Sequence, residues 1–504
     1  MDVFYLLILT IFYILLYIVY RFFMRNQKYW EKLGVPTVKS SVPYFGNVWS
    51  VLMQRKSFGE LYYELYKSIP NSSMIGLYNC GENELMIKDP ELIKTVLQTN
   101  FNSFEQNGFE FDTEMDPLLK RNPFVTTGEK WKNERLVLTN TMSASKLKNM
   151  SITIRQIGVK FSEYLSEKID ENRGVFETDA QILFARFTAE VVAGVGFGID
   201  GQCFKKDTGT FVEMGGKLFN PSGLMAIKQF IIFVLPSLAR VLRTSFLSKE
   251  FDTYCRRVIH DVLKIRKEKG TRGNDFIQHV VDLYKSESGE IDEDFVTCHA
   301  TSFYIDGYLT SSHTLAYLAY DIARHPEVQN KLRAEVKEII KKHQGELTYD
   351  AIQDMKYLDL VMKESMRVSS LLASMQKKCT QEFKLVGSDG VECVVKPGMK
   401  LILSPQGIHN DPKYWTNPEK FLPERFDDEH KNDFHKFAYL PFGGGARICP
   451  GMRMATLQMK YAIVTLLNNY SLTVSSRTKL PFTFDNVAIL NIPQGGIWLN
   501  IKPL

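Results

Sequence analysis

The chain has 504 residues, of which 44% are hydrophobic and 24% are charged, and its formal net charge is +5. These fractions are those of an ordinary globular protein, and the mild positive charge fits a basic docking face or anionic lipid better than dedicated nucleic-acid binding. The length allows about three domains, but no linker interrupts the body, and the scattered cysteines argue for a reducing compartment and against a disulfide framework.

The N-terminus begins with an apolar run. Residues 3–20 (VFYLLILTIFYILLYIVY) carry no charge and are just long enough to cross a bilayer as a helix. Arg21, Arg25 and Lys28 lie on its C-terminal side, and basic flanks stay in the cytosol, so the body is expected there. A cleaved signal peptide is the competing interpretation, but the run is long and no small-residue cleavage site follows it.

The chain is predicted to divide into a transmembrane anchor, a linker and one catalytic domain, over residues 1–24, 25–44 and 45–504. In the body, short strand-like segments alternate with longer helical ones. Strands are expected at residues 74–78, 84–88 and 497–501, with a hairpin over 382–404 around the turn 388–390. Helices are expected at residues 130–142, 152–173, 294–324 and 326–343. The sequence thus predicts a mainly α fold with small β-sheets.

Two polar groups share the helix expected at residues 130–142. Trp131 and Arg135 are one helical turn apart, so they can aim an indole N–H and a guanidinium at one point. An amphipathic helix with a single arginine on its rim is the alternative.

A second apolar stretch covers residues 224–242 (LMAIKQFIIFVLPSLARVL) and is interrupted by Lys228 and Pro236. The interruptions argue against a second membrane span. Two interpretations stay open: a buried core helix, or a surface segment that dips into the membrane near a substrate entrance.

The longest expected helix carries DGYLTSS at residues 306–312. Gly307 weakens the helix there by about 1 kcal/mol relative to alanine, which suits a site where a small molecule lies against the backbone. Thr310 lies one turn beyond Asp306, so the two side chains share a face. A threonine hydroxyl on that face can relay protons, whereas a hydroxyl that bonds back to a helix carbonyl is the alternative.

Two charged motifs follow. Residues 363–367 (KESMR) place Glu364 and Arg367 at i, i+3, where they can pair on one helix face. Residues 423–426 (PERF) add Arg425. Taken alone, such a pair is a common surface salt bridge.

The most informative segment is residues 442–451, FGGGARICPG. Its three consecutive glycines allow a tight turn with positive φ and a close approach of the backbone to a flat cofactor. Pro450 suits the first position of the following helix, so Cys449 is expected at a helix N-terminus, where the dipole favours a thiolate. Arg447 can reach a carboxylate of the cofactor. A buried free cysteine is the alternative, and zinc is disfavoured because no second Cys or His lies at ligand spacing.

This segment closely resembles the heme-binding signature of the cytochrome P450 family, the heme-thiolate monooxygenases. The resemblance covers residues 30–504, with the motifs in the expected order. Several short sequence segments are most similar to those of insect-type microsomal members, which handle lipophilic foreign compounds. It implies the cytochrome P450 fold and heme b, with Cys449 as the axial ligand of the iron. A thiolate in that position favours O–O cleavage.

The resemblance also assigns the residues described above. The heme contacts that it implies are Phe442, Arg447, Trp131, Arg135 and Lys377. Thr310 would hydrogen-bond dioxygen and relay protons. The charged motifs would form a buried triad, Glu364, Arg367 and Arg425, that serves folding and heme retention.

A phenylalanine-rich segment, residues 101–124, would form a loop over the substrate by the same resemblance. Phe104, Phe109 and Phe111 are either apolar walls of the pocket or ordinary packing, and the sequence does not separate the two.

Several positions depart from the family pattern: Ser369, Ser370 and Leu371 stand where the family usually has paired prolines, and three further positions bear on the site. Asp306 stands at the usual alanine and Leu309 at the usual acid, so the acid has moved one turn back. We expect Asp306 either to take part in proton delivery or to anchor a cationic or hydroxylated substrate; a water-bridged aspartate without a role is the alternative. Lys377 replaces an arginine and can neutralise a heme propionate only as a point charge.

The function implied is insertion of one atom of O2 into a lipophilic small molecule, at the endoplasmic reticulum membrane, with a single N-terminal span and a cytosolic catalytic domain. Electrons from NADPH would arrive through NADPH–cytochrome P450 reductase, with cytochrome b5 as a second candidate donor, and Lys130, Lys132 and Arg135 are candidate docking residues. Two alternatives stay open: a heme-thiolate isomerase or dehydratase that does not use O2, and a heme-containing binding protein without turnover.

Overall fold

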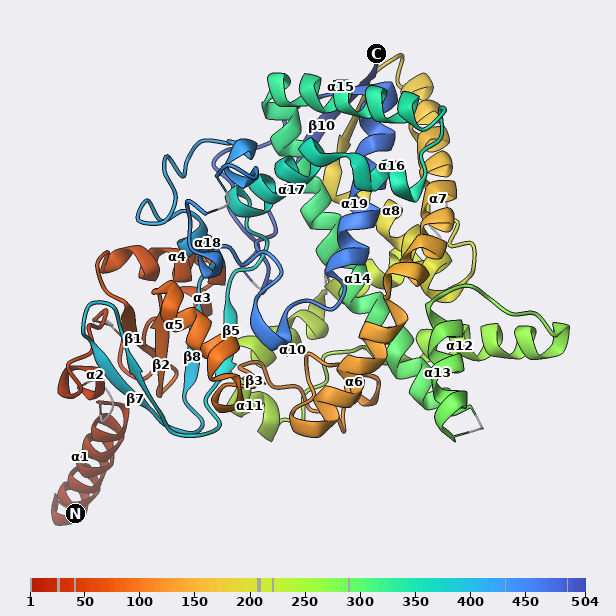
Figure 1. Cartoon of the computed structure of the whole chain (residues 1–504). Helices are drawn as coiled ribbons and strands as arrows, with labels where there is room; N and C mark the ends of the chain where they lie inside the picture. Colours follow the sequence, from red (N-terminus) through yellow and green to blue (C-terminus); the bar gives the residue numbers. More distant parts are fainter. Residues whose placement is uncertain are drawn as a thin grey trace.

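A long helix, α14 (Glu293–Arg324), runs through the helical part of the molecule (Figure 1). It packs against α8 (Ala180–Val191) and α19 (Met452–Asn469). Most of its side chains are buried, and these include polar ones such as His299, Ser312 and Asp321 as well as apolar ones. Asp292 caps its first turn by accepting the N–H groups of Asp294 and Phe295. The computed structural model describes residues 2–24, 28–39, 42–205, 210–219, 222–288, 291–430, 432–486 and 488–504.

The remaining helices surround this centre. Before α8 they are α1 (Asp2–Met24), α2 (Tyr29–Lys32), α3 (Trp49–Leu52), α4 (Phe58–Ser68), α5 (Pro90–Lys94), α6 (Gly128–Thr141) and α7 (Ala144–Glu171). After it come α9 (Thr210–Phe219), α10 (Gly223–Val234), α11 (Pro236–Val241), α12 (Lys249–Lys269), α13 (Phe276–Ser288), α15 (Pro326–Lys342), α16 (Tyr349–Asp354), α17 (Lys356–Val368) and α18 (Pro405–His409).

Three small sheets complete the fold. The five-stranded sheet has the order β1 (Met74–Asn79), β2 (Glu82–Ile87), β8 (Lys400–Leu403), β5 (Met375–Lys378), β3 (Gln106–Asn107). The three-stranded sheet has the order β4 (Phe176–Asp179), β10 (Trp498–Pro503), β9 (Tyr470–Val474), and β6 (Phe383–Val386) pairs with β7 (Glu392–Val395). The prediction of a mainly α fold with small sheets is confirmed.

Two element predictions need correction. Residues 382–404 do not form one hairpin: β6 and β7 pair around the predicted turn, but β8 lies parallel to β2 in the larger sheet. Its buried Leu401, Ile402 and Leu403 explain this, because a continuous apolar strand belongs inside a sheet. Helix α7 begins at Ala144, well before the expected residue 152, because its first two turns are polar and periodicity alone does not reveal them.

The apolar stretch at residues 224–242 forms two helices that meet at Pro236, which is the first residue of α11. Ile232 and Val234 are buried. Leu224, Val241 and Leu242 are exposed, with 57% to 79% of each residue accessible. The stretch therefore packs partly into the core and also exposes apolar side chains, and its insertion into a membrane stays a prediction.

Among the described residues, only 180–197 form a helix long and apolar enough to cross a membrane, and 72% of that window is buried in the fold. This helix belongs to the core. At a rise of 1.5 Å per residue, the 23 residues of α1 extend about 35 Å. Its apolar side chains from Phe4 to Leu15 are exposed. The N-terminal span stays a prediction.

Candidate active site

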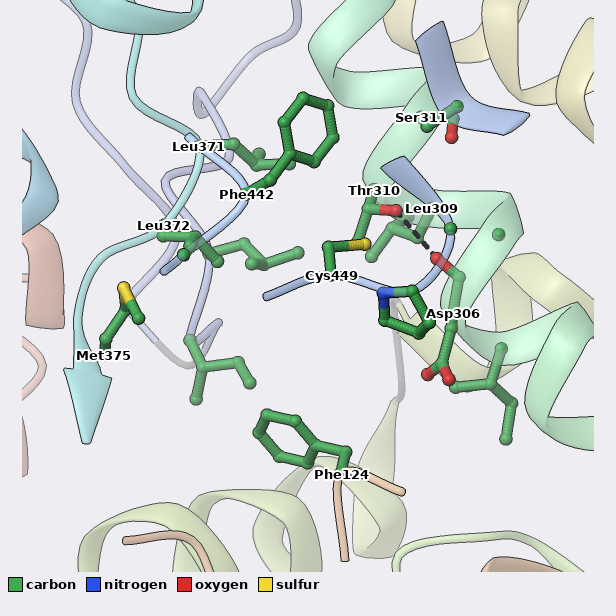
Figure 2. Close-up of a pocket in the computed structure, with 18 of the residues that line it drawn as sticks. Phe124, Asp306, Leu309, Thr310, Ser311, Leu371, Leu372, Met375, Phe442 and Cys449 are labelled. Carbon is green, nitrogen blue, oxygen red and sulfur yellow. Dashed lines mark hydrogen bonds between the residues drawn. The ribbon is translucent and has the colours of Figure 1, made fainter. Parts of the chain in front are cut away.

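A cavity of about 640 Å³ lies between α14, α6, β5 and the loop that precedes α19 (Figure 2). This volume suits a small-molecule site. Each heme-contact candidate lines it: Cys449, Phe442, Arg447, Trp131, Arg135 and Lys377. Asp306, Leu309 and Thr310 line it from α14. The structure thus brings together every candidate cofactor and catalytic residue that the sequence singled out.

The cysteine loop is held by its backbone. The N–H of Cys449 donates to the carbonyl oxygen of Phe442 at 2.9 Å. Gly445 has a φ of +66°, and a Cβ there would lie 1.7 Å from the carbonyl oxygen of Leu97. Only glycine fits this position, because the left-handed conformation and the close approach each exclude a side chain.

The helix after the cysteine begins later than expected. Gly451 precedes the first residue of α19, Met452, so Pro450 lies before the helix and not at its first position. The backbone N–H groups of Gly451 and Met452, at the start of the helix, nevertheless lower the pKa of the Cys449 thiol. The sulfur therefore lies at a helix N-terminus, as predicted.

Two opposing effects act on the Cys449 thiol. Burial raises its pKa to about 11, whereas the backbone N–H groups of Gly451 and Met452 and the charge of Arg135 lower it. The start of the helix therefore favours the thiolate, and burial opposes it. A bound metal ion deprotonates a coordinating thiol outright. Elsewhere in the described chain, no group of three or more His, Cys, Asp or Glu could hold a metal ion. A metal that is held mainly by its own macrocycle fits this single ligand.

Three cations line the cavity without a carboxylate partner in the described structure: Arg135, Arg447 and Lys377. Arg447 donates to the carbonyl oxygens of Pro123 (2.7 Å) and Thr126 (2.8 Å), and its guanidinium lies 4.5 Å from the Trp131 ring centre. Its Nε is buried and has no hydrogen-bond partner among the residues described. Burial lowers the pKa of Arg447 to about 10.

Lys377 is 3% exposed and donates to Asn107 Oδ1 at 2.8 Å. Burial, together with the nearby Arg447, lowers its pKa to about 7. Arg135 is also buried enough for its pKa to be lowered. Lys377 is buried and the two arginines are half-buried. None of the three forms an ion pair with a carboxylate in the described structure, although Glu105 is near enough to raise the pKa of Arg447. Such cations favour an anionic ligand, and the two propionates of heme would fit them. Arg135 therefore belongs to the cavity wall, whereas Lys132 is exposed and pairs with Glu129.

On α14, the Thr310 hydroxyl donates to the carbonyl oxygen of Asp306 at 2.7 Å, drawn dashed in Figure 2. The hydroxyl thus bonds back to the helix, as the alternative interpretation has it, and Thr310 also lines the cavity, so its role as a proton relay stays a prediction. Leu309 is buried. Asp306 is exposed, and it lines the cavity. Its carboxylate accepts the side-chain N–H of Asn122 at 3.1 Å, and desolvation by the surrounding protein raises its pKa to about 7.

The phenylalanine-rich segment divides into wall and packing. Phe109 and Phe111 line the cavity, and both contact Phe124 and Phe233 at centroid distances of 5.8 to 6.4 Å. Phe104 does not line it: its ring packs against Phe383 at 5.6 Å. The alternative left open by the sequence is thus decided residue by residue.

The charged triad is confirmed. Arg367 donates to both carboxylate oxygens of Glu364, at 2.8 and 2.9 Å, and Arg425 donates to Glu364 at 3.3 Å. Glu364 and Arg367 are fully buried. Neither lines the cavity, so the triad supports the fold from behind it.

Sequence analysis did not identify Asn122 or Asn107. Asn122 donates a hydrogen bond to Asp306, which lies 184 residues further along the chain. Asn107 accepts a hydrogen bond from Lys377, which lies 270 residues further along. Each asparagine thus orients a charged group of the cavity. An Asn-Pro pair, such as residues 122–123, is a signal for a turn and does not reveal the distant partner of the asparagine.

Comparisons with known proteins agree with this geometry. The family model described as Cytochrome P450 matches residues 36–500. The chain is 31% identical to cytochrome P450 9e2 of Blattella germanica, over 95% of this chain and 94% of that protein. It is 32% identical to cytochrome P450 6B2 of Helicoverpa armigera, over 97% of each chain. It is 31% identical to cytochrome P450 6B1 of Papilio polyxenes, over 95% of this chain and 96% of that protein.

Proposed function

The chain belongs to the cytochrome P450 family of heme-thiolate monooxygenases, and we propose that it oxidises a lipophilic small molecule with electrons delivered from NADPH by NADPH–cytochrome P450 reductase. One observation carries the proposal: a single cysteine sulfur, Cys449, shares a largely apolar cavity with Thr310 and with three cations that have no carboxylate partner in the described structure.

Cys449 would ligate the heme iron, and Arg135, Arg447 and Lys377 would neutralise the propionates. Trp131 supports Arg447 through its ring face. Phe442 holds the cysteine loop through its carbonyl oxygen. Bound heme would supply the activation of dioxygen, of which one atom would enter the substrate and the other would leave as water with the two electrons from the reductase and two protons.

The chain's own groups bind substrate and move protons. Phe109 and Phe111 supply apolar walls that exclude water from the reacting centre. The Thr310 hydroxyl donates a hydrogen bond to the backbone carbonyl oxygen of Asp306. The oxygen of this hydroxyl can therefore still accept a hydrogen bond. Rotation of that hydroxyl would turn its proton toward the cavity, so Thr310 can act as a relay.

The exposed surfaces support a proposal for the location and the partners. Helix α1 would anchor the protein in the endoplasmic reticulum membrane, with the apolar face of α10 and α11 dipping into the same bilayer. The catalytic domain, residues 45–504, would then lie in the cytosol. Lys130 and Lys132 are candidate contacts for the acidic reductase, with cytochrome b5 as a second donor.

The decisive experiment is the carbon monoxide difference spectrum of the reduced, purified protein. The red-shifted band of a thiolate-ligated iron should appear, and Cys449→Ala should remove it. Oxidation of a lipophilic test compound should then require both NADPH and the reductase. Turnover without NADPH would support the isomerase or dehydratase alternative, which the apolar Leu309 at the family's acid position motivates. Binding without any product would support the binding protein.

A further inference from the structure

The Asp306 carboxylate lines the cavity with only one of its oxygens satisfied. Oδ2 accepts the hydrogen bond from Asn122. No described residue donates to Oδ1, and no described Lys, Arg or His forms an ion pair with Asp306. Figure 2 shows the carboxylate on the side of the cavity where Phe124 lies. A carboxylate oxygen with no protein partner is thus available to a ligand.

The position of this carboxylate is fixed by a well-ordered neighbour. Asn122 is 3% exposed, and its Oδ1 accepts the N–H of Phe124 at 2.7 Å. Its backbone carbonyl accepts the N–H and the hydroxyl of Thr126, at 3.0 and 3.2 Å. Because the other side-chain and carbonyl oxygens of Asn122 are engaged, its N–H₂ group has one orientation, and it holds Asp306 Oδ2 in place.

The surroundings make an unpaired carboxylate costly. Phe111, Phe124 and Phe246 line the same cavity, and their rings contact one another or Phe233. An anion in such surroundings is destabilised unless it is paired. The cations that line the cavity do not pair with Asp306 in the described structure. The aromatic faces and the carboxylate together describe a receptor for a weakly hydrated cation.

We propose that Asp306, held by Asn122, selects lipophilic substrates that carry a cationic nitrogen, which pairs with Oδ1 while the phenylalanine wall holds the apolar body. This inference rests on the proposed function, since it names the substrate class of the same cavity. Asp306 touches substrate in this arrangement, and Asn122 is a positioning residue.

The test compares two ligands that differ only in charge. One is 4-phenylbutyl-trimethylammonium, and the other is its uncharged isostere, in which carbon replaces nitrogen. A quaternary ammonium cannot coordinate iron, so the spectral titration of the purified, heme-loaded full chain reports only occupation of the cavity. The cation should bind at least about tenfold more tightly, the typical effect of one charge-assisted contact.

The variants separate the roles. Asp306→Asn should bring the two ligands to about equal affinity, and Asn122→Ala should reduce the preference part of the way. Asp350→Asn, which removes an exposed aspartate that pairs with Lys148, should leave the preference unchanged.

Equal affinities in the wild-type protein, or a preference that survives Asp306→Asn, would overturn the proposal. If Asp306→Asn fails to retain heme, the wild-type comparison and Asn122→Ala still decide it. Preference for an alcohol over both ligands would assign Asp306 to hydroxylated substrates instead. The carbon monoxide band and NADPH-dependent oxidation of an uncharged compound report the monooxygenase function separately.

Discussion

The conformation of the cysteine loop depends on a glycine that no other residue can replace. At Gly445, a Cβ would lie 1.7 Å from the Leu97 carbonyl oxygen, and the φ of +66° disfavours any other residue. The loop and residues 95–99 therefore hold each other in place. Their contact sets where the Cys449 sulfur meets the cavity.

Gly445→Ala should displace the cysteine loop, because neither the backbone of Leu97 nor the left-handed turn can accept a methyl group. We expect the purified variant to retain less than about half of its heme and to lose 1–3 kcal/mol of stability. Heme content per chain and the thermal midpoint measure this. Gly216→Ala, where a Cβ meets nothing within 4 Å, should behave like the wild type.

The buried triad supplies a second prediction. Glu364→Gln removes the negative charge that faces both Arg367 and Arg425, and Arg367 is fully buried. Leaving that cation unpaired should cost about 3–5 kcal/mol. Denaturant unfolding of the purified protein measures the loss. Glu346→Gln, which removes one partner of the exposed Arg155 pair, should change stability by less than about 1 kcal/mol.

At the scale of elements, a buried aspartate joins α14 to α17. Asp321 accepts hydrogen bonds from the hydroxyls of Ser365 at 2.7 Å and Ser369 at 3.1 Å. It is 3% exposed, and burial raises its pKa to about 7. Between about pH 4 and pH 7, Asp321 therefore carries a proton in the folded protein that it has already released in the unfolded chain.

This contact predicts a pH dependence. Because the pKa of Asp321 is higher in the folded than in the unfolded protein, its protonation adds to the free energy of unfolding. This contribution is fully present below about pH 4 and is lost as the pH rises through about 7. Asp321→Asn keeps the shape but carries no titrating proton. The thermal midpoint of the variant should therefore increase relative to that of the wild type as the pH rises from 5 to 8. A constant difference across this range would contradict the assignment, and Asp350→Asn is the exposed control.

At the scale of the whole molecule, two apolar surfaces are exposed. Helix α1 extends from the lower left of Figure 1, and α11 lies along the bottom of the same view. Val241 and Leu242, at the end of α11, are 79% and 57% exposed. Exposed apolar surface of this kind marks a contact with a partner or a membrane.

Removal of residues 1–24 should weaken binding to phosphatidylcholine vesicles without abolishing it, because α11 still offers an apolar surface. Adding Val241→Asp and Leu242→Asp should lower the remaining partition at least about tenfold, since each such side chain contributes about 1.5 kcal/mol or more when buried. Vesicle flotation measures both steps. Ile152→Asp, at an exposed apolar position on α7, should not change the partition.

The sequence by itself determined what local chemistry controls. Glycines, a proline and an arginine around Cys449 describe a cofactor loop. The spacing of Glu364 and Arg367 predicts their pair, and helical periodicity predicts α14. These features depend on neighbours within a turn or two of the chain, so one sequence is enough to reveal them.

Only the tertiary structure decided which distant groups meet. It showed that Asn122 hydrogen-bonds Asp306. Phe104 packs against Phe383, whereas Phe109 lines the cavity. Strand β8 pairs with β2 in the larger sheet. The tertiary structure also showed that burial raises the pKa of the Cys449 thiol, against the effect of the neighbouring N–H groups. Burial and contacts between residues far apart in sequence arise from packing of the whole chain, and no local pattern encodes them.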